Sequence, residues 1–265
     1  MPELPEVEAY RRLAEEALDR PIAAVLLLDL RYLRGGTTPG QIRRVLKGAS
    51  FSAAHRIGKL LVLDLEGTAA ATGQSLGVRF GMTGSLFVDG HSAIDELIYS
   101  SKARGAQWDR FGVRFADGGD LVVHDPRVFG GVTLDPDETA LGPDALALTP
   151  AELRHALAGS AAPLKARLLD QARIAGIGNL LADEILWRAS LAPHRRAGSL
   201  TPAENRRLHH HIRTTLTELS ARGGSHLGDL MLARRKGGRC PRDGSALMIS
   251  TVGGRTTYWC PRHQK

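Results

Sequence analysis

Cysteine and long apolar runs are scarce in this chain of 265 residues. The two cysteines, Cys240 and Cys260, both lie in the last 26 residues, which argues against a disulfide framework and predicts reduced thiols. No apolar run reaches the roughly 18 residues of a membrane span, and the acidic start lacks the profile of a signal peptide. We therefore expect a cytoplasmic protein that does not enter a membrane.

Charge is unevenly distributed along the sequence. Residues 194–265 contain 14 lysines and arginines against 4 acidic residues, whereas the whole chain has a net charge of +7. Such a basic region favours a polyanionic partner, above all nucleic acid, through phosphate contacts and counterion release. The competing explanation is that the basic residues serve only solubility. That explanation suffices for any single arginine but accounts poorly for so many basic residues within 194–265. With 43% hydrophobic residues, the chain can bury the cores of one to three domains.

The first half of the chain has the pattern of a mostly β domain. Strand-like runs occupy residues 24–30, 60–65, 111–115 and 121–124. The turn Asp117-Gly118-Gly119-Asp120 predicts a hairpin between the last two runs. Ahead of the strands, apolar residues at helical spacing predict a first helix that begins near Pro5.

The second half is predicted to be helical up to a final hairpin. Prolines and acidic residues mark residues 136–150 as a linker. The runs Thr149-Pro150-Ala151-Glu152 and Thr201-Pro202-Ala203-Glu204 each combine a capping threonine with the proline and glutamate of a helix start. Two more helices are expected at residues 163–170 and 179–189. The tail beyond residue 234, with paired glycines around β-prone residues, predicts a hairpin finger.

The N-terminus carries a candidate catalytic pair. Removal of Met1, which a small second residue permits, would expose the secondary amine of Pro2. An α-amino group has a pKa of about 7.7–8.0, so part of it is unprotonated at neutral pH. Such an amine can attack a sugar aldehyde carbon to form an iminium ion, and Glu3 can move protons beside it. These residues also suit the ordinary start of a helix, and taken alone they favour that simpler interpretation.

Six segments of the chain occur in the order found in one known family. They are Pro2-Glu3-Leu4-Pro5-Glu6-Val7-Glu8, Arg56-Ile57-Gly58-Lys59, Gly81-Met82-Thr83-Gly84-Ser85-Leu86, Asp125-Pro126-Arg127-Val128-Phe129-Gly130, Gly176-Ile177-Gly178-Asn179 through Glu184, and the terminal finger. With them the chain resembles the formamidopyrimidine-DNA glycosylase and endonuclease VIII (Fpg/Nei) family, and is closer to the Fpg branch. The resemblance implies an α+β multidomain fold. Its parts would be an N-terminal β-sandwich with a leading helix (1–135), a linker (136–150), a helix-two-turn-helix domain (151–230) and a C-terminal β-hairpin zinc finger (231–265).

The resemblance also implies a bifunctional DNA glycosylase and abasic-site lyase of base excision repair. Its partner would be damaged double-stranded DNA of the nucleoid, bound by a monomer. In the family, the N-terminal proline attacks C1′ of an everted nucleotide, the damaged base leaves, and β,δ-elimination cuts the strand. This makes Pro2 the nucleophile, Glu3 the proton-transfer group and Glu6 a supporting catalytic residue. Lys59 matches the family lysine that meets a phosphate and aids catalysis, although a lysine at a strand end is often merely solvated.

Further matched positions imply contacts to DNA. The residues assigned to DNA binding are Arg79, Met82, Arg127, Phe129, Asn179, Lys236 and Arg255. Three of them, Met82, Arg127 and Phe129, match the side chains that the family inserts into the gap left by the everted nucleotide. Outside these motifs Met82 and Phe129 would be assigned to a core, and Asn179 suits a helix start as well as a phosphate contact. Arg79 stands where the family commonly has His, and its permanent charge should preserve phosphate binding.

The terminal finger departs from the four cysteines usual in the family. Its two pairs are Cys240-Pro241-Arg242-Asp243 and Cys260-Pro261-Arg262-His263, with 16 residues between them. Zinc accepts thiolate, carboxylate and imidazole in a tetrahedral shell, so Cys240, Asp243, Cys260 and His263 are the expected ligands of a structural Zn²⁺. Aspartate is an uncommon structural ligand, so a metal-free hairpin and a site of three ligands plus water stay open as alternatives.

A short segment between Gly223 and Gly237 bears on substrate choice. Family members that act on 8-oxoguanine carry a longer loop here, which closes over the flipped purine. The short segment therefore favours oxidised pyrimidines, hydantoin-like lesions, bare abasic sites or bulkier adducts over 8-oxoguanine.

Two other functions stay open. A non-catalytic damaged-DNA-binding or sensing protein would suit the altered finger but has no need of Pro2, Glu3 and Lys59. An RNA- or ribosome-associated helix-two-turn-helix protein would explain the basic half and leave the N-terminal motif unexplained.

Overall fold

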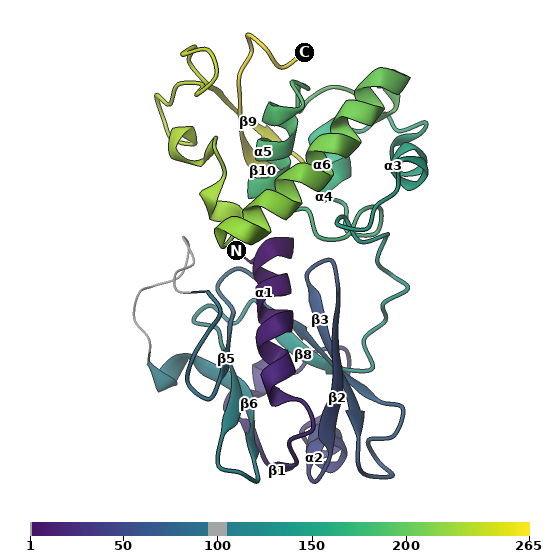
Figure 1. Cartoon of the computed structure of the whole chain (residues 1–265), viewed down its shortest axis with the longest axis vertical. Coiled ribbons are helices and arrows are strands. Elements are labelled where there is room, and N and C mark those ends of the chain that lie inside the picture. Colours follow the sequence, from purple (N-terminus) through teal and green to yellow (C-terminus); the bar gives the residue numbers. More distant parts are fainter. Residues whose placement is uncertain (1, 95–104) are drawn as a thin grey trace. The chain divides into compact units, whose positions relative to one another are not determined.

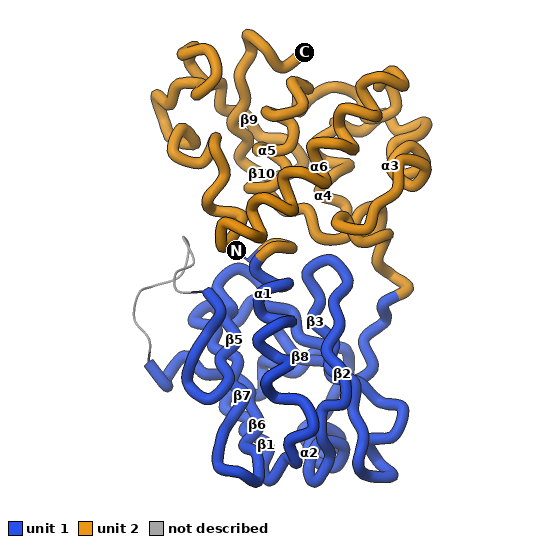
Figure 2. The backbone as a smooth tube through the Cα atoms, in the orientation of Figure 1, with its two compact units in different colours: residues 1–2, 6–138 blue, residues 3–5, 139–265 orange. Residues whose placement is uncertain are grey.

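The computed structural model describes residues 2–94 and 105–265. The chain forms two compact units, which Figure 2 shows in different colours: residues 1–2 with 6–138, and residues 3–5 with 139–265. Residues 3–5 thus belong with the second unit, even though the first helix begins at Leu4.

The first unit is an antiparallel β-sandwich with a leading helix (Figure 1). One four-stranded sheet has the order β1-β6-β7-β5, and the other has the order β2-β3-β4-β8. The helices are α1 (Leu4–Ala14) and α2 (Pro39–Leu46), with 3₁₀ turns η1 (Glu15–Ala17), η2 (Leu30–Tyr32) and η3 (Ala106–Trp108). The strands are β1 (Ile22–Leu27), β2 (Ser50–Ile57), β3 (Leu60–Glu66), β4 (Ser75–Arg79), β5 (Ser85–Val88), β6 (Asp109–Phe115), β7 (Asp120–His124) and β8 (Gly131–Leu134).

Burial of apolar side chains explains how the sandwich is held together. Residues 60–63 of β3 are all buried, as expected for a strand that is covered on both faces. The helix α1 joins the same core, where the ring of Tyr10 lies 4.7 Å from the ring of Phe80, centre to centre. Each large apolar side chain buried in this way contributes about 1.5–3 kcal/mol to folding. The predicted hairpin is confirmed, because β6 and β7 pair antiparallel.

One predicted strand is partly wrong. The strand expected over residues 24–30 ends at Leu27, because Asp29 accepts a hydrogen bond from the backbone N–H of Arg31 at 3.0 Å and starts a 3₁₀ turn. Local side-chain-to-backbone bonds of this kind compete with a strand ladder. The side chains of Leu28 and Leu30 are consequently exposed, although the backbone N–H of Leu28 still donates to the carbonyl of Arg110 at 3.1 Å.

The second unit is helical and ends in a two-stranded hairpin. Its helices are α3 (Pro150–Leu157), α4 (Leu164–Leu169), α5 (Asn179–Arg188) and α6 (Pro202–Arg222), with 3₁₀ turns η4 (Ala197–Ser199), η5 (Ser225–Leu227) and η6 (Met231–Ala233). The hairpin strands are β9 (Met248–Val252) and β10 (Arg255–Trp259). Both predicted capping boxes are confirmed: Thr149 with Glu152 starts α3, and Thr201 with Glu204 starts α6. Together the two units confirm the predicted α+β fold of sandwich, helix-two-turn-helix region and finger. Within the described ranges, no helix is long and apolar enough to cross a membrane.

A buried ionic network fastens the hairpin to α4 and α5. The ammonium of Lys165 lies 2.7 Å from Asp183 Oδ1 and donates to Thr257 Oγ1 at 2.8 Å. The other carboxylate oxygen of Asp183 accepts from the guanidinium of Arg234 at 2.9 Å and from the backbone N–H of Tyr258 at 3.2 Å. Burial lowers the pKa of Lys165, and the adjacent Asp183 opposes that effect. Removing the Asp183 carboxylate would leave the buried cations of Lys165 and Arg234 without a partner, which is strongly destabilising. The network therefore holds the finger firmly against α5.

Candidate active site and metal centre

The carboxylate of Glu3 is held at the amino end of α5. Its two oxygens accept hydrogen bonds from the backbone N–H groups of Gly178 (2.9 Å), Leu180 (2.8 Å) and Leu181 (3.1 Å). The residue has no exposed surface. Free N–H groups and the positive end of the helix dipole both stabilise a negative charge at this position. The Glu3 carboxyl group is therefore fixed in place one peptide bond after Pro2.

The glycines of the Gly176-Ile177-Gly178 turn make this arrangement sterically feasible. A Cβ atom at residue 178 would lie 2.3 Å from the carboxyl carbon of Glu3. Gly176 adopts φ = +113°, which favours glycine, and its carbonyl accepts the backbone N–H of Leu4 at 3.2 Å. The turn is thus built to receive the N-terminal segment. The next residue, Asn179, begins α5, and its buried Oδ1 has no hydrogen-bond partner within the described residues.

Three other residues with predicted catalytic roles lie in the first unit. Pro2 is buried just ahead of α1, and Glu6 is buried in the first turn of that helix. Lys59 is half-buried in the tight turn between β2 and β3, where Gly58 adopts φ = +57°. The guanidinium of Arg56 donates to the carbonyl of Gly58 at 2.9 Å and so supports the shape of the turn.

Asp125 organises the two loops that carry Met82, Arg127 and Phe129. It is fully buried and accepts hydrogen bonds from the hydroxyl of Thr83 and from the backbone N–H of Gly130 at 2.8 Å. The loops approach closely: a Cβ atom on Gly81 would lie 2.5 Å from the backbone nitrogen of Gly130.

The side chains on these two loops differ in exposure. Phe129 is 54% exposed, and the guanidinium of Arg127 lies 4.6 Å from the centre of its ring, whereas Met82 is half-buried. Arg79 is exposed at the end of β4 and pairs in register with Gly131, just beyond the second loop. Four of the residues predicted to bind DNA are therefore brought together on this unit.

The segment between Gly223 and Gly237 is short and tightly bound to the second unit. It holds only the 3₁₀ turns η5 and η6. Glu184 of α5 accepts the backbone N–H groups of Asp229 (3.1 Å) and Leu230 (2.9 Å). The carboxylate of Asp229 in turn accepts from Arg188 at 2.7 Å and from Arg222 at 2.6 Å. Lys236 lies at the end of this segment and Arg255 begins β10, and both are exposed.

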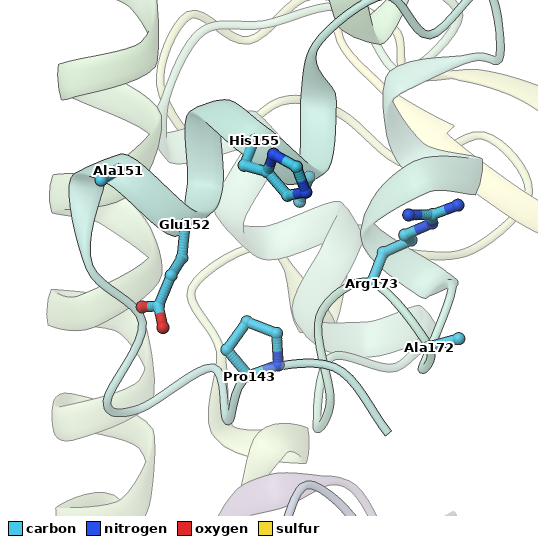
Figure 3. Close-up of a pocket in the computed structure, with 7 residues that line it drawn as sticks. Pro143, Ala151, Glu152, His155, Ala172 and Arg173 are labelled. Carbon is cyan, nitrogen blue, oxygen red and sulfur yellow. The ribbon is translucent and has the colours of Figure 1, made fainter. Parts of the chain in front are cut away.

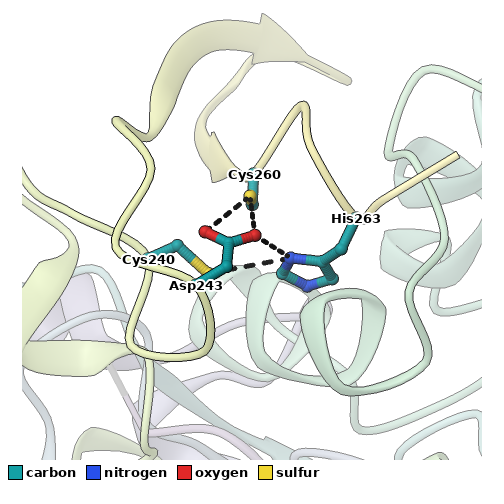
Figure 4. Close-up of side chains that lie close together, drawn as sticks. All are labelled: Cys240, Asp243, Cys260 and His263. Carbon is teal, nitrogen blue, oxygen red and sulfur yellow. Dashed lines mark hydrogen bonds and ion pairs between the residues drawn. The ribbon is translucent and has the colours of Figure 1, made fainter.

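Four side chains of the finger converge on one point (Figure 4). The ligand atoms of Cys240, Asp243, Cys260 and His263 all lie within 4.8 Å of one another, and both cysteines are buried. Asp243 Oδ2 is 3.3 Å from Cys260 Sγ and 3.3 Å from His263 Nδ1, and Cys240 Sγ is 3.7 Å from the same nitrogen. Ligands about 2.0–2.3 Å from a tetrahedral zinc are separated by roughly 3.3–3.8 Å, so these four residues fit a metal ion.

The electrostatics of the cluster suit a cation. Hydrogen bonds from the hydroxyl and backbone N–H of Ser245 hold the pKa of Asp243 well below its ordinary value. They engage Oδ1, which leaves Oδ2 turned toward the cysteine and the histidine. Burial raises the pKa of the Cys240 thiol, so a bound metal would have to displace its proton.

A separate hollow lies beside α3 (Figure 3). It has a volume of about 440 Å³ and is lined by Pro143, Ala151, Glu152, His155, Ala156, Ala172 and Arg173. None of the predicted site residues lines it, and Glu152 is engaged in the cap of α3. It is therefore not part of the candidate active site.

Comparison with known proteins places the whole chain in one family. The family description "Formamidopyrimidine-DNA glycosylase N-terminal domain" matches residues 1–132, and "Formamidopyrimidine-DNA glycosylase H2TH domain" matches residues 140–229. A formamidopyrimidine-DNA glycosylase of Paracoccus denitrificans is 33% identical over 296 residues, and one of Carboxydothermus hydrogenoformans is 35% identical over 284 residues. Both alignments cover 100% of each chain. The chain belongs to the Fpg/Nei family of DNA glycosylases.

Solved structures of Fpg proteins share the complete fold. Lactococcus lactis Fpg bound noncovalently to DNA containing an abasic site is 26% identical, with a TM-score of 0.82 and 99% of each chain covered. The same enzyme with DNA containing an oxidised pyrimidine is 25% identical, with a TM-score of 0.82 and 100% of each chain covered. These similarities confirm the resemblance seen in the sequence and identify a scaffold used for base excision repair.

Several residues that shape the site were not singled out from the sequence. They are Asp125, which joins the two loops, Lys165 and Asp183, which hold the finger to α5, and Trp187, which touches Cys240. A lysine among the leucines of a short helix and an aspartate within a buried helix are the sequence signals that could have revealed the ionic pair.

Proposed function

We propose that this Fpg/Nei protein is a bifunctional DNA glycosylase and abasic-site lyase, with Pro2 as nucleophile. The observation that carries the proposal is the Glu3 carboxylate, held by three backbone N–H groups immediately after Pro2. Three donors hold this buried carboxyl group in one position, directly after the residue whose α-amine would be freed by removal of Met1.

A covalent intermediate between Pro2 and the sugar would divide base removal and strand cleavage into several easier steps. The lone pair of the Pro2 nitrogen attacks C1′ of an everted nucleotide, and the bond from C1′ to the damaged base breaks as the base takes up a proton. The nitrogen then loses its proton and the C1′–O4′ bond breaks as O4′ takes up a proton, so that the nitrogen lone pair forms a C1′=N⁺ iminium. The iminium withdraws electrons from C1′, which permits loss of a C2′ proton with departure of the 3′ phosphate, and then loss of the C4′ proton with departure of the 5′ phosphate. Glu3 moves protons at the sugar, with Glu6 and Lys59 assisting.

Damaged double-stranded DNA is the proposed partner. Related Fpg proteins have been crystallised with DNA containing an abasic site or an oxidised pyrimidine. We assign Met82, Arg127 and Phe129 to the gap left by the everted nucleotide, because Phe129 is exposed although apolar and Asp125 braces the loops. Arg79, Asn179, Lys236 and Arg255 are assigned to phosphates.

The substrate we propose is an oxidised base other than 8-oxoguanine, with oxidised pyrimidines and hydantoin-like lesions foremost. Support comes from the segment 223–237, which is short and is bound to α5 through Glu184. A segment fastened in this way is poorly suited to fold over a purine. We further propose that the protein acts as a monomer on nucleoid DNA in the cytoplasm, and that residues 231–265 form its finger.

An incision panel tests the activity directly. Duplex and single-stranded oligonucleotides carrying a bare abasic site, an oxidised pyrimidine, a hydantoin or 8-oxoguanine are incubated with the protein, and the cleaved ends are identified. We expect incision of the abasic and pyrimidine duplexes with a phosphate left on both ends, and weaker cutting of the 8-oxoguanine duplex. Tight binding without any incision would instead favour a damage-sensing protein.

The finger is proposed to hold one structural Zn²⁺ through Cys240, Asp243, Cys260 and His263. When bound, the ion would fix the hairpin that presents Arg255. We expect one zinc per chain. Removal of a residue that only hydrogen-bonds a metal ligand typically lowers metal affinity about 10–100-fold, and replacing the ligand Asp243 by alanine should lower zinc affinity by more than that. The measurement is metal analysis combined with chelator competition, and Asp243→Cys should retain the metal. Protein that contains no zinc and still cuts DNA would refute the site.

A further inference from the structure

Trp187, near the end of α5, touches two of the four clustered residues of the finger. Its indole Nε1–H donates a hydrogen bond to Cys240 Sγ at 3.3 Å, and its backbone carbonyl lies 3.3 Å from His263 Nε2. The side chain is only 6% exposed and packs with both cysteines and with Leu230 and Leu247. The sulfur is the partner that satisfies the buried indole N–H.

The contact to Cys240 has a chemical reason once a metal is bound. Two thiolates and one carboxylate give a divalent ion a single excess negative charge. An N–H donor directed at one thiolate stabilises that charge and fixes the direction of the sulfur lone pair, as outer-shell partners of metal sites do.

The contact of the Trp187 carbonyl with His263 determines which ring nitrogen of the imidazole carries the proton. Nδ1 of this ring is turned toward the other ligand atoms and lies 3.3 Å from Asp243 Oδ2. The proton of a neutral, metal-binding ring then resides on Nε2, which donates it to the Trp187 carbonyl. Trp187 thus supports both a sulfur and a nitrogen ligand from one helix position.

We propose that Trp187 is a positioning residue of the metal centre, which orients the sulfur of Cys240 through its indole N–H and the ring of His263 through its carbonyl. This inference rests on the proposed zinc site and extends it. It makes α5 a shared support, since the first turn of the helix binds Glu3 and its last turn orders the finger.

The test compares zinc binding by the full-length variants W187F and W259F. Phenylalanine keeps an aromatic ring but removes the N–H group. Trp259 is a stringent control because it lies in the same finger next to Cys260, while its Nε1 has no hydrogen-bond partner among the described residues. Competition with a chromophoric chelator should show zinc affinity reduced about 10–100-fold in W187F and unchanged in W259F.

Cobalt distinguishes the loss of a hydrogen bond from a loss of packing. The thiolate-to-metal charge-transfer band of the Co²⁺ protein reports the electron density on sulfur. Without the N–H donor the band should move to lower energy in W187F, whereas looser packing alone would weaken binding without moving it. An unmoved band or an unchanged affinity in W187F would overturn the proposal. Failure of the unaltered protein to bind either metal would overturn the zinc site itself.

Discussion

Blocking the α-amine of Pro2 is expected to abolish covalent trapping of the protein on abasic DNA by borohydride. An amide nitrogen has no available lone pair, so it cannot attack C1′ and no iminium forms for borohydride to reduce. Incision of abasic DNA should fall at least about a hundredfold, the low end of what a positioned catalytic group contributes. The measurement is the yield of the cross-linked species on a denaturing gel, with the protein carrying a removable extension ahead of Pro2.

The same extension provides the control. Its removal, leaving Pro2 as the first residue, should restore both trapping and incision, and an identical extension at the C-terminus should have no effect. Undiminished trapping of the blocked protein would show that a lysine is the nucleophile. DNA affinity should change little in either form, because the phosphate contacts are assigned to other residues.

Replacement of Glu3 by glutamine is expected to slow base excision by about 10²–10⁴-fold, the range typical of general acid–base groups. The amide can neither take up nor release the proton as a carboxyl group does. It also presents an –NH₂ group toward donors, whereas the carboxylate accepts N–H from Gly178, Leu180 and Leu181. Leaving a buried donor without an acceptor costs about 1–3 kcal/mol, so the variant should also unfold at lower temperature.

Glu152 offers a matched control for the effect on stability. Its carboxylate also accepts a backbone N–H, that of Thr149 at 2.8 Å, and this cap lowers the pKa of Glu152. Glu152→Gln should therefore weaken the start of α3 slightly and leave single-turnover excision unchanged. Measured by rapid quench on a lesion-bearing duplex, excision by Glu3→Gln at the unaltered rate would remove Glu3 from the mechanism.

Local signals identified many of the elements correctly. The capping threonines Thr149 and Thr201 were recognised because a capping box lies within four consecutive residues, and the hairpin turn at 117–120 is equally local. The strands β2, β4, β5 and β8 were not predicted. The partners of β5 and β8 lie far along the chain, whereas β2 and β4 both pair with the neighbouring β3 but contain few β-prone residues. Asp29 ends β1 early because its carboxylate accepts the backbone N–H of Arg31, and apolar periodicity does not reveal such a bond.

By itself, the sequence determined the family, the α+β class, the candidate nucleophile and the spacing of the finger ligands, since each depends on residues close together in the chain. Only the tertiary structure decided that Glu3 is anchored by the start of α5, that Asp125 braces two loops, and that Trp187 touches a finger cysteine. Such contacts join segments widely separated in sequence. They depend on backbone groups and on packing, which the type and spacing of nearby side chains do not specify.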